Sequence, residues 1–361
     1  MYSRLAAISF KPSGSAHSQC AQLNTKENNM HAVIENSDSG FFGYWDKLYA
    51  NDPVQNPIYM QQRADSLKIE DSAAQFTDRS FLVMASEEPV FGCSLTLHLD
   101  EQGRKCIGYF GREASSHINQ SSIQVPTNNF RPEVVRLLQA HIGQLIEEIQ
   151  PHSIEYLDPV CCGVMSPITQ VLLNHGGRPV PQRSQLIDIS IAGRELHRNM
   201  SKRCRGMVEW GRRHLDIEIV HSGCFDVSTS DHPLSSNLEK VFTDNDKFIY
   251  ESLVKRGNGF LMQGRYKNEL VASSLFVHNN KTCHQVFAEN KSGSLDRPVL
   301  HALTWEAMLH SKRASCSQFD FGSTAIWSLS KNSVKPDDFN ASSFGGERHV
   351  QLRTTLKRAA D

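Results

Sequence analysis

The strongest constraint on the fold is an order of secondary-structure elements that occurs twice in the sequence. Each half of the 361 residues reads as a helix, strands that include a hairpin, a second helix and a further strand. The two copies lie about 170–180 residues apart, which is the size of an ordinary domain. The pattern predicts two related α/β (α+β) units, each a mixed, largely antiparallel sheet flanked by helices, and it argues against one large barrel.

The first half contains a clear hairpin and a clear helix. Two apolar runs between Ser80 and Leu99 flank a Glu-Glu-Pro turn, which predicts a hairpin. Apolar residues at helical spacing follow Pro132 and continue to Ile149, which predicts a helix. Short strands are predicted over residues 106–112, 153–159 and 184–191.

The second half shows the same order. Helices are predicted over residues 194–214 and 235–257, with a strand between them. Residues 259–290 predict three strands joined by two hairpin turns. An amphipathic helix over residues 297–314 and a strand over 317–323 follow.

Composition indicates a soluble globular protein. Hydrophobic residues make up 39% and charged residues 21%, and the formal net charge of -1 gives no general preference for DNA or for anionic membranes. No apolar run approaches the roughly 18 residues of a membrane helix, and the first residues show no secretory pattern, so we expect a cytoplasmic protein. Residues 1–38 predict a poorly ordered tail, followed by domains over 39–191 and 192–361.

The nine cysteines and sixteen histidines form no metal-binding motif. The cysteine number is odd, and Cys161 and Cys162 are adjacent, which favours free thiols in a reducing compartment. No HExxH or zinc-finger spacing occurs, so no metal site is expected. Because no activating partner is evident for Cys283 or Cys316, we expect no covalent nucleophile.

Short motifs in the second half occur in a fixed order. Ser201, Lys202 and Arg205 lie in the basic helix, a Trp-Glu-Ala segment begins at Trp305, and a Phe-Asp-Phe-Gly segment begins at Phe319. A Phe-Gly-Gly-Glu segment at residues 344–347 follows Phe339. This order resembles the FemAB-like aminoacyltransferases and the related GNAT-fold acyltransferases of cell-envelope gene clusters. Two departures are Asn340, where that family has Lys, and the absence of the coiled-coil arm of some members.

The resemblance implies a transferase that moves an acyl or aminoacyl group to an amine. The donor would be acyl-CoA or aminoacyl-tRNA, bound as a substrate, with no tightly bound cofactor. The acceptor would be an anionic small-molecule or lipid-linked envelope precursor, such as an amino sugar, a surface polysaccharide or a peptidoglycan stem. In such proteins the groove between the halves receives the acceptor, so Tyr109 and Arg112 are candidate acceptor ligands. The protein would work in the cytoplasm, either free or at the periphery of the inner membrane.

The loop before the helix at 297–314 is a candidate phosphate site. Ser292, Gly293 and Ser294 could surround an anion, and Arg297 lies at the first turn of the helix, where free N–H groups favour negative charge. The same residues fit a plain polar turn with Asp296 as the N-cap.

The basic helix is a second candidate for donor binding. Arg198, Lys202 and Arg205 follow i, i+4 and i+7 spacing and therefore share one face, which would suit a polyphosphate or a tRNA backbone. A solvated surface helix would show the same charge run.

Proton removal from an acceptor amine needs a base, and three residues are candidates. Glu289 ends a strand before the phosphate loop, Asp320 lies on the strand after the helix, and His284 precedes Glu289 on the same strand. Structural roles for all three remain open. The whole protein also has two alternative readings, a non-catalytic GNAT-fold protein that senses an envelope precursor and an RNA-binding accessory protein. The sequence does not indicate the oligomeric state.

Overall fold

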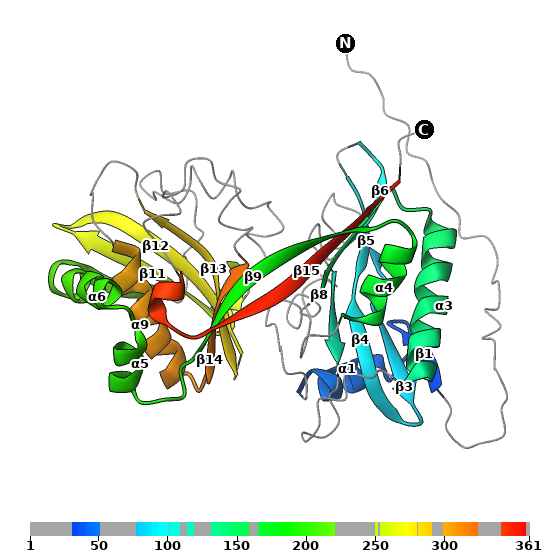
Figure 1. Ribbon diagram of the computed structural model, residues 1–361, viewed down its shortest axis with the longest axis horizontal. Coiled ribbons are helices and arrows are strands. Elements are labelled where there is room, and N and C mark those ends of the chain that lie inside the picture. Colours follow the sequence, from blue (N-terminus) through cyan, green and yellow to red (C-terminus); the bar gives the residue numbers. More distant parts are fainter. Residues whose placement is uncertain are drawn as a thin grey trace, which may run out of the picture.

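A single mixed sheet runs through two lobes of the protein (Figure 1). The computed structural model describes residues 31–50, 77–100, 102–108, 114–118, 131–158, 165–220, 250–251, 253–279, 281–290, 299–323 and 341–358. The main path of the sheet has the strand order β1-β3-β4-β7-β8-β15-β9-β14-β13-β12-β11-β10. Off this path, β2 pairs with β5, and β6 pairs with both β5 and β8. The predicted α/β class is therefore confirmed, with the sheets of the two halves merged into one.

The first lobe is an α/β sandwich. Its strands are β1 (His31–Glu35), β2 (Thr77–Asp78), β3 (Phe81–Ala85), β4 (Glu88–Ser94), β5 (Thr96–Leu99), β6 (Lys105–Gly108), β7 (Ala114–Ile118) and β8 (Ser153–Asp158). Its helices are α1 (Phe41–Ala50), α3 (Pro132–Ile149) and α4 (Pro167–Asn174). The predicted hairpin and the helix over 132–149 are both confirmed.

Both faces of this part of the sheet are covered, which explains the continuous apolar run in β3. Phe81 and Val83 pack into the core that α3 and α4 close, whereas Leu82 and Met84 contact the core that α1 closes. Successive side chains of a strand point to opposite faces, so a strand between two helical layers needs apolar residues at every position.

The second lobe repeats this plan with different helices. Its strands are β9 (Arg178–Asp188), β10 (Asp216–Val220), β11 (Gly259–Tyr266), β12 (Glu269–His278), β13 (Thr282–Asn290), β14 (Gln318–Ser323) and β15 (Glu347–Lys357). Its helices are α5 (Gly193–Asn199), α6 (Lys202–His214), α9 (Val299–Arg313) and the short η2 (Ala341–Phe344). Phe260, Met262 and Phe276 pack in one core with α9, and α6 lies beside α9. The predicted strand triplet over 259–290 and the strand at 317–323 are confirmed.

Strands β9 and β15 join the two lobes as a long twisted ribbon (Figure 1). Strand β15 pairs with β9 from Glu347 to Thr355 and with β8 from Leu352 to Lys357, so it lies between two strands of the first half. A second contact comes from α1, where the Tyr49 hydroxyl accepts a hydrogen bond of 3.1 Å from the Asn279 amide. A boundary after residue 191 therefore does not separate two independent sheets.

Two predicted boundaries need correction. Residues 31–35, expected in a poorly ordered tail, form β1 because they pair with β3 from His31 to Glu35. The single helix expected over 194–214 is two helices, because Ser201 leaves helical geometry and its hydroxyl caps the Cys204 N–H at the start of α6. The helix expected over 235–257 lies largely outside the described residues.

Glycine is required at residue 346, next to the ribbon. Gly346 has φ +82°, and a Cβ there would overlap the Leu186 carbonyl oxygen of β9. We expect Gly346→Ala to cost more than about 3 kcal/mol of unfolding free energy, because backbone strain adds to the clash. Gly103→Ala is the matched control: its φ is +73° but nothing lies within 4 Å of its Cβ position, so it should cost only about 1–2 kcal/mol. Urea denaturation of both variants measures the difference, and equal costs would contradict the clash.

Candidate functional site

The second lobe contains a parallel strand pair that separates after three residue pairs. Strand β13 pairs with β14 at Thr282↔Gln318, Cys283↔Phe319 and His284↔Asp320. Beyond His284, β13 continues to Asn290 along β12, and within the described residues no further pairing with β14 occurs. Val286 is the extra residue of a bulge, because Gln285 and Phe287 face consecutive residues of β12. Beyond His284 the backbone of β13 therefore has no ladder pairing with β14 within the described residues.

The last residue pair before the strands separate is a buried histidine and carboxylate. His284 Nδ1 lies 3.3 Å from Asp320 Oδ2, and the two residues are 8% and 9% exposed. The other carboxylate oxygen, Oδ1, accepts a hydrogen bond from the Gly322 N–H at 2.8 Å and one from the Ser184 hydroxyl. Three strands, β13, β14 and β9, therefore contribute to one hydrogen-bonded chain.

The environment keeps the Asp320 carboxylate charged. Burial alone would raise the pKa of Asp320, but the hydrogen bonds from His284, Ser184 and Gly322, with the attraction of His284, outweigh burial and lower this pKa. A carboxylate that accepts from Nδ1 leaves the Nε2 lone pair of a neutral imidazole available as a proton acceptor. Within the described part of the chain, the buried Nε2 atom of His284 has no hydrogen-bond partner.

The third predicted base, Glu289, lies apart from this pair. Glu289 faces Ser273 across β12, whereas His284 faces Val277, so the two residues share one face of the sheet but are four residue steps apart. At about 3.3 Å per step the separation along the strand is about 13 Å. The structure brings His284 and Asp320 together and leaves Glu289 outside the pair.

The basic helix lies on the opposite face of the sheet. Cys283, next to His284, packs in the core with α9, so the His284 side chain points to the other face, while α6 lies beside α9. Arg205 donates hydrogen bonds to the Arg198 and Met200 carbonyls at 3.0 and 2.6 Å, which fastens the joint between α5 and α6. Arg198 is 3.9 Å from Glu195, and Lys202 is exposed at the start of α6. These cations do not converge on the His284–Asp320 pair.

The remaining predicted residues lie outside the described part of the chain. They are the loop residues Ser292, Gly293, Ser294 and Arg297 and the acceptor candidates Tyr109 and Arg112. Among the residues that the structure does describe, no group of three or more His, Cys, Asp or Glu side chains is arranged to hold a metal ion. None of the helices in the described ranges combines the length and apolar character that a bilayer crossing demands.

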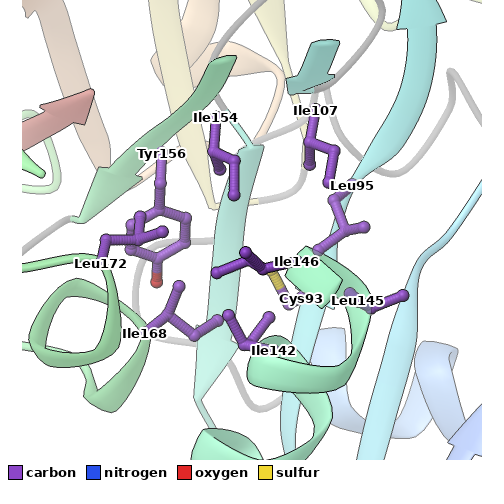
Figure 2. Close-up of a pocket in the computed structure, with 10 residues that line it drawn as sticks. All are labelled: Cys93, Leu95, Ile107, Ile142, Leu145, Ile146, Ile154, Tyr156, Ile168 and Leu172. Atoms are coloured by element: carbon purple, nitrogen blue, oxygen red, sulfur yellow. The ribbon is translucent and has the colours of Figure 1, made fainter. Parts of the chain in front are cut away.

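The cavity in the first lobe is a packing defect of the core. Figure 2 shows its lining, which comes from α3, α4 and the strands that they cover and is almost entirely aliphatic. Its volume is about 20 Å³, close to that of one water molecule and far below that of a substrate site. The first lobe therefore shows no counterpart of the buried polar pair in this cavity.

A larger groove of about 260 Å³ lies on the outer side of the second lobe. Its floor is apolar, with Ile217, Ile219 and Met262, and its rim carries the ion pair of Arg212 with Glu306 at 2.9 Å. Met262 packs in the core with α9, so this groove opens on the face away from His284.

Fold and site together define a two-lobed protein with a tandem GNAT-like fold, in which the separating parallel strands lie in the second lobe. Among solved structures, the chain is similar to FemX, with a TM-score of 0.61 and 12% identity over 89% of this chain and 96% of FemX. It is also similar to a tandem GNAT protein from the clavulanic acid biosynthesis pathway, with a TM-score of 0.54 and 13% identity over 92% of this chain and all of that one. No protein-family model matches the sequence, and no curated protein matches it. At these identities the likeness establishes the fold alone.

The sequence analysis missed Ser184 and the bulge at Val286. Ser184 was recognised only as the start of a strand, because its partner Asp320 is 136 residues away in sequence. Successive side chains of a strand point to opposite faces, and Ile187 and Ile189 point into the core. Ser184 therefore lies on the other face, toward His284, and this alternation was the signal available in the sequence.

The charge state of Asp320 predicts a pH-dependent stability effect. Because the folded-state pKa of Asp320 is lowered, its stabilising contribution is present above the unfolded pKa of about 3.9 and is lost as pH falls through the folded value. We expect Asp320→Asn to destabilise the protein by about 1–3 kcal/mol at neutral pH, because the amide cannot accept all three hydrogen bonds. The difference from wild type in denaturant titrations should shrink below about pH 4; a difference that is constant with pH would contradict a buried carboxylate.

Proposed function

We propose that this protein transfers an acyl or aminoacyl group from a carrier to an amine, with His284 as the general base. The observation that carries this proposal is the buried His284–Asp320 pair, which lies where β13 and β14 separate. The overall likeness to FemX and to a tandem GNAT protein supports the same class of reaction.

The chemistry follows from the position of the pair. The acceptor amine attacks the donor carbonyl, a C–N bond forms, and the C–S bond of a thioester or the C–O bond of an ester breaks. His284 Nε2 accepts the proton that the amine loses and returns it to the leaving group, while Asp320 stabilises the imidazolium through Nδ1. Backbone N–H groups near the Val286 bulge would stabilise the developing oxyanion.

A covalent cysteine intermediate does not fit this site. Cys283 is adjacent to His284 in sequence, but its side chain packs in the apolar core on the other face, and burial raises its pKa well above the usual value. Burial likewise raises the pKa of Cys316, to about 11. Since only a thiolate is a strong nucleophile, direct attack of the acceptor on the donor is the better mechanism.

The substrates are the finer part of the proposal. We propose acyl-CoA or aminoacyl-tRNA as the donor, with its phosphates near Ser292, Gly293, Ser294 and Arg297. Arg198, Lys202 and Arg205 would contact only a large donor such as tRNA that reaches round to the α6 face. The proposed acceptor is an anionic or lipid-linked cell-envelope precursor with a free amine, held by Tyr109 and Arg112. The reaction would take place in the cytoplasm, on soluble precursors or at the inner face of the membrane.

Donor identity is tested by ligand stabilisation. We expect acetyl-CoA to raise the melting temperature by several degrees, because a ligand at 100 times its Kd stabilises by about 2.7 kcal/mol. Uncharged tRNA should stabilise only if the donor is aminoacyl-tRNA, and that effect should fall steeply with salt. Differential scanning fluorimetry with both ligands measures this; no stabilisation by either would count against a transferase.

The role of His284 is tested by turnover with the donor that binds. With acetyl-CoA, release of the thiol is followed with glucosamine and a lysine-containing stem peptide as amines. We expect His284→Gln to lower kcat by about 10²–10⁴-fold with little change in the KM for the donor, as for loss of a general base. His349→Gln on β15 is the control, because that imidazole is exposed and only 3.9 Å from exposed Glu347. Equal kcat values in both variants would remove His284 from the mechanism.

A further inference from the structure

Ser184 is hydrogen-bonded to the carboxylate that partners the proposed base, His284. Ser184 belongs to β9, which with β15 forms the ribbon between the lobes, and is 4% exposed. Its hydroxyl donates to Asp320 Oδ1, and the other carboxylate oxygen faces His284 Nδ1 at 3.3 Å. We infer that Ser184 is a positioning residue, which orients the Asp320 carboxylate and thereby fixes His284 as the tautomer with a free Nε2 lone pair.

The two oxygens of the Asp320 carboxylate have different partners, and this difference supports the inference. Ser184 and the Gly322 N–H both bind Oδ1, one from β9 and one from the turn after Asp320. Two donors from different directions fix the rotation of the carboxylate plane, so that Oδ2 stays directed at the imidazole. Without Ser184 only the local Gly322 contact remains on Oδ1, so the rotation of the carboxylate about its Cβ–Cγ bond is less restricted.

The Phe-Gly-Gly-Glu segment explains how Ser184 is held in place. Gln185 Nε2 donates to the Gly345 carbonyl at 2.6 Å, and the missing side chain of Gly346 lets the backbone approach Leu186. The ladder between β9 and β15 then begins at Leu186↔Glu347 and includes Ser184↔His349. On its other side β9 pairs with β14, at Leu186↔Asp320 and Ser184↔Ser323. This motif therefore holds β9 on its β15 side, and the direct pairing of β9 with β14 brings Ser184 to Asp320.

The inference rests on the proposed function in so far as His284 is the base, but its central claim concerns the protein alone. It predicts a histidine tautomer, which nitrogen-15 NMR of histidine-labelled protein reports without any substrate. The His284 signals are assigned by their absence in His284→Gln. In wild type at neutral pH we expect Nε2 to show the shift of an unprotonated nitrogen and Nδ1 that of a protonated one.

Three variants test the role of Ser184. In Ser184→Ala we expect the His284 nitrogen shifts to move toward the average of the two tautomers, and kcat to fall about tenfold with the donor KM within about twofold. Ser184→Thr keeps the hydroxyl and should restore both the shifts and kcat to near wild type. Ser80→Ala is the control, since Ser80 is a buried serine of the first lobe that bonds to the Leu95 backbone; it should change stability only.

Opposite results would overturn the inference. Unchanged His284 shifts in Ser184→Ala, or a loss of thermal stability alone as in Ser80→Ala, would assign Ser184 a structural role. If the alanine variant does not fold, Ser184→Cys serves in its place, because a thiol is a weaker donor of similar shape and should move the shifts in the same direction. If Ser184→Ala changes the His284 nitrogen shifts but the wild-type protein transfers no acyl group, the proposed function is contradicted. The positioning role of Ser184 is then still supported.

Discussion

The structure depends on one strand being shared between the two lobes. Strand β15 inserts between β8 and β9, so its backbone satisfies hydrogen bonds of the first half while its sequence belongs to the second. On its other edge β9 pairs directly with β14, so β9 links the inserted strand to the strand that carries Asp320. The contact of Ser184 with Asp320 follows from the register between β9 and β14.

The two lobes have the same architecture but different interiors. In the first lobe the space between α3, α4 and the sheet is closed by aliphatic side chains around a cavity of about 20 Å³. In the second lobe the face away from α9 carries a charged carboxylate, held by three donors that compensate for its loss of water. The first lobe also buries an aspartate, Asp158, which accepts hydrogen bonds from the Ser166 N–H at 2.6 Å and the Thr169 hydroxyl at 2.7 Å. The second lobe differs because its carboxylate is paired with a histidine at the point where β13 and β14 separate.

Much of the fold could be predicted from local patterns. The helix over 132–149, the hairpin after Ser80 and the three strands over 259–290 each have a periodicity or a turn that local rules describe. The joint at Ser201 was missed because a polar cap inside a basic run looks like a continuing helix. Strand β1 was missed because its five residues lie in a polar stretch and become a strand only by pairing with β3.

The site was predictable in part. His284 and Asp320 were both candidates, but only the parallel register of β13 and β14 shows that they meet and that Glu289 does not join them. The alternation along β9 could have placed Ser184 on the face away from the core, but its partner Asp320 could not be predicted because strand pairing over more than a hundred residues leaves no local signal. The hydrogen bonds of Arg205 to the backbone between α5 and α6 had no sequence signal either, and the role of this residue in donor binding stays a prediction.

The shared strand also has a consequence for the order of events during synthesis. The first lobe emerges early from the ribosome, yet the edges of β8 and β9 stay open until residues 347–357 have been made. During that interval two extended edges are exposed, and such edges readily pair with other chains. The sheet of the first lobe is therefore completed only after residues 347–357 have left the exit tunnel, which is late relative to the synthesis of its other strands.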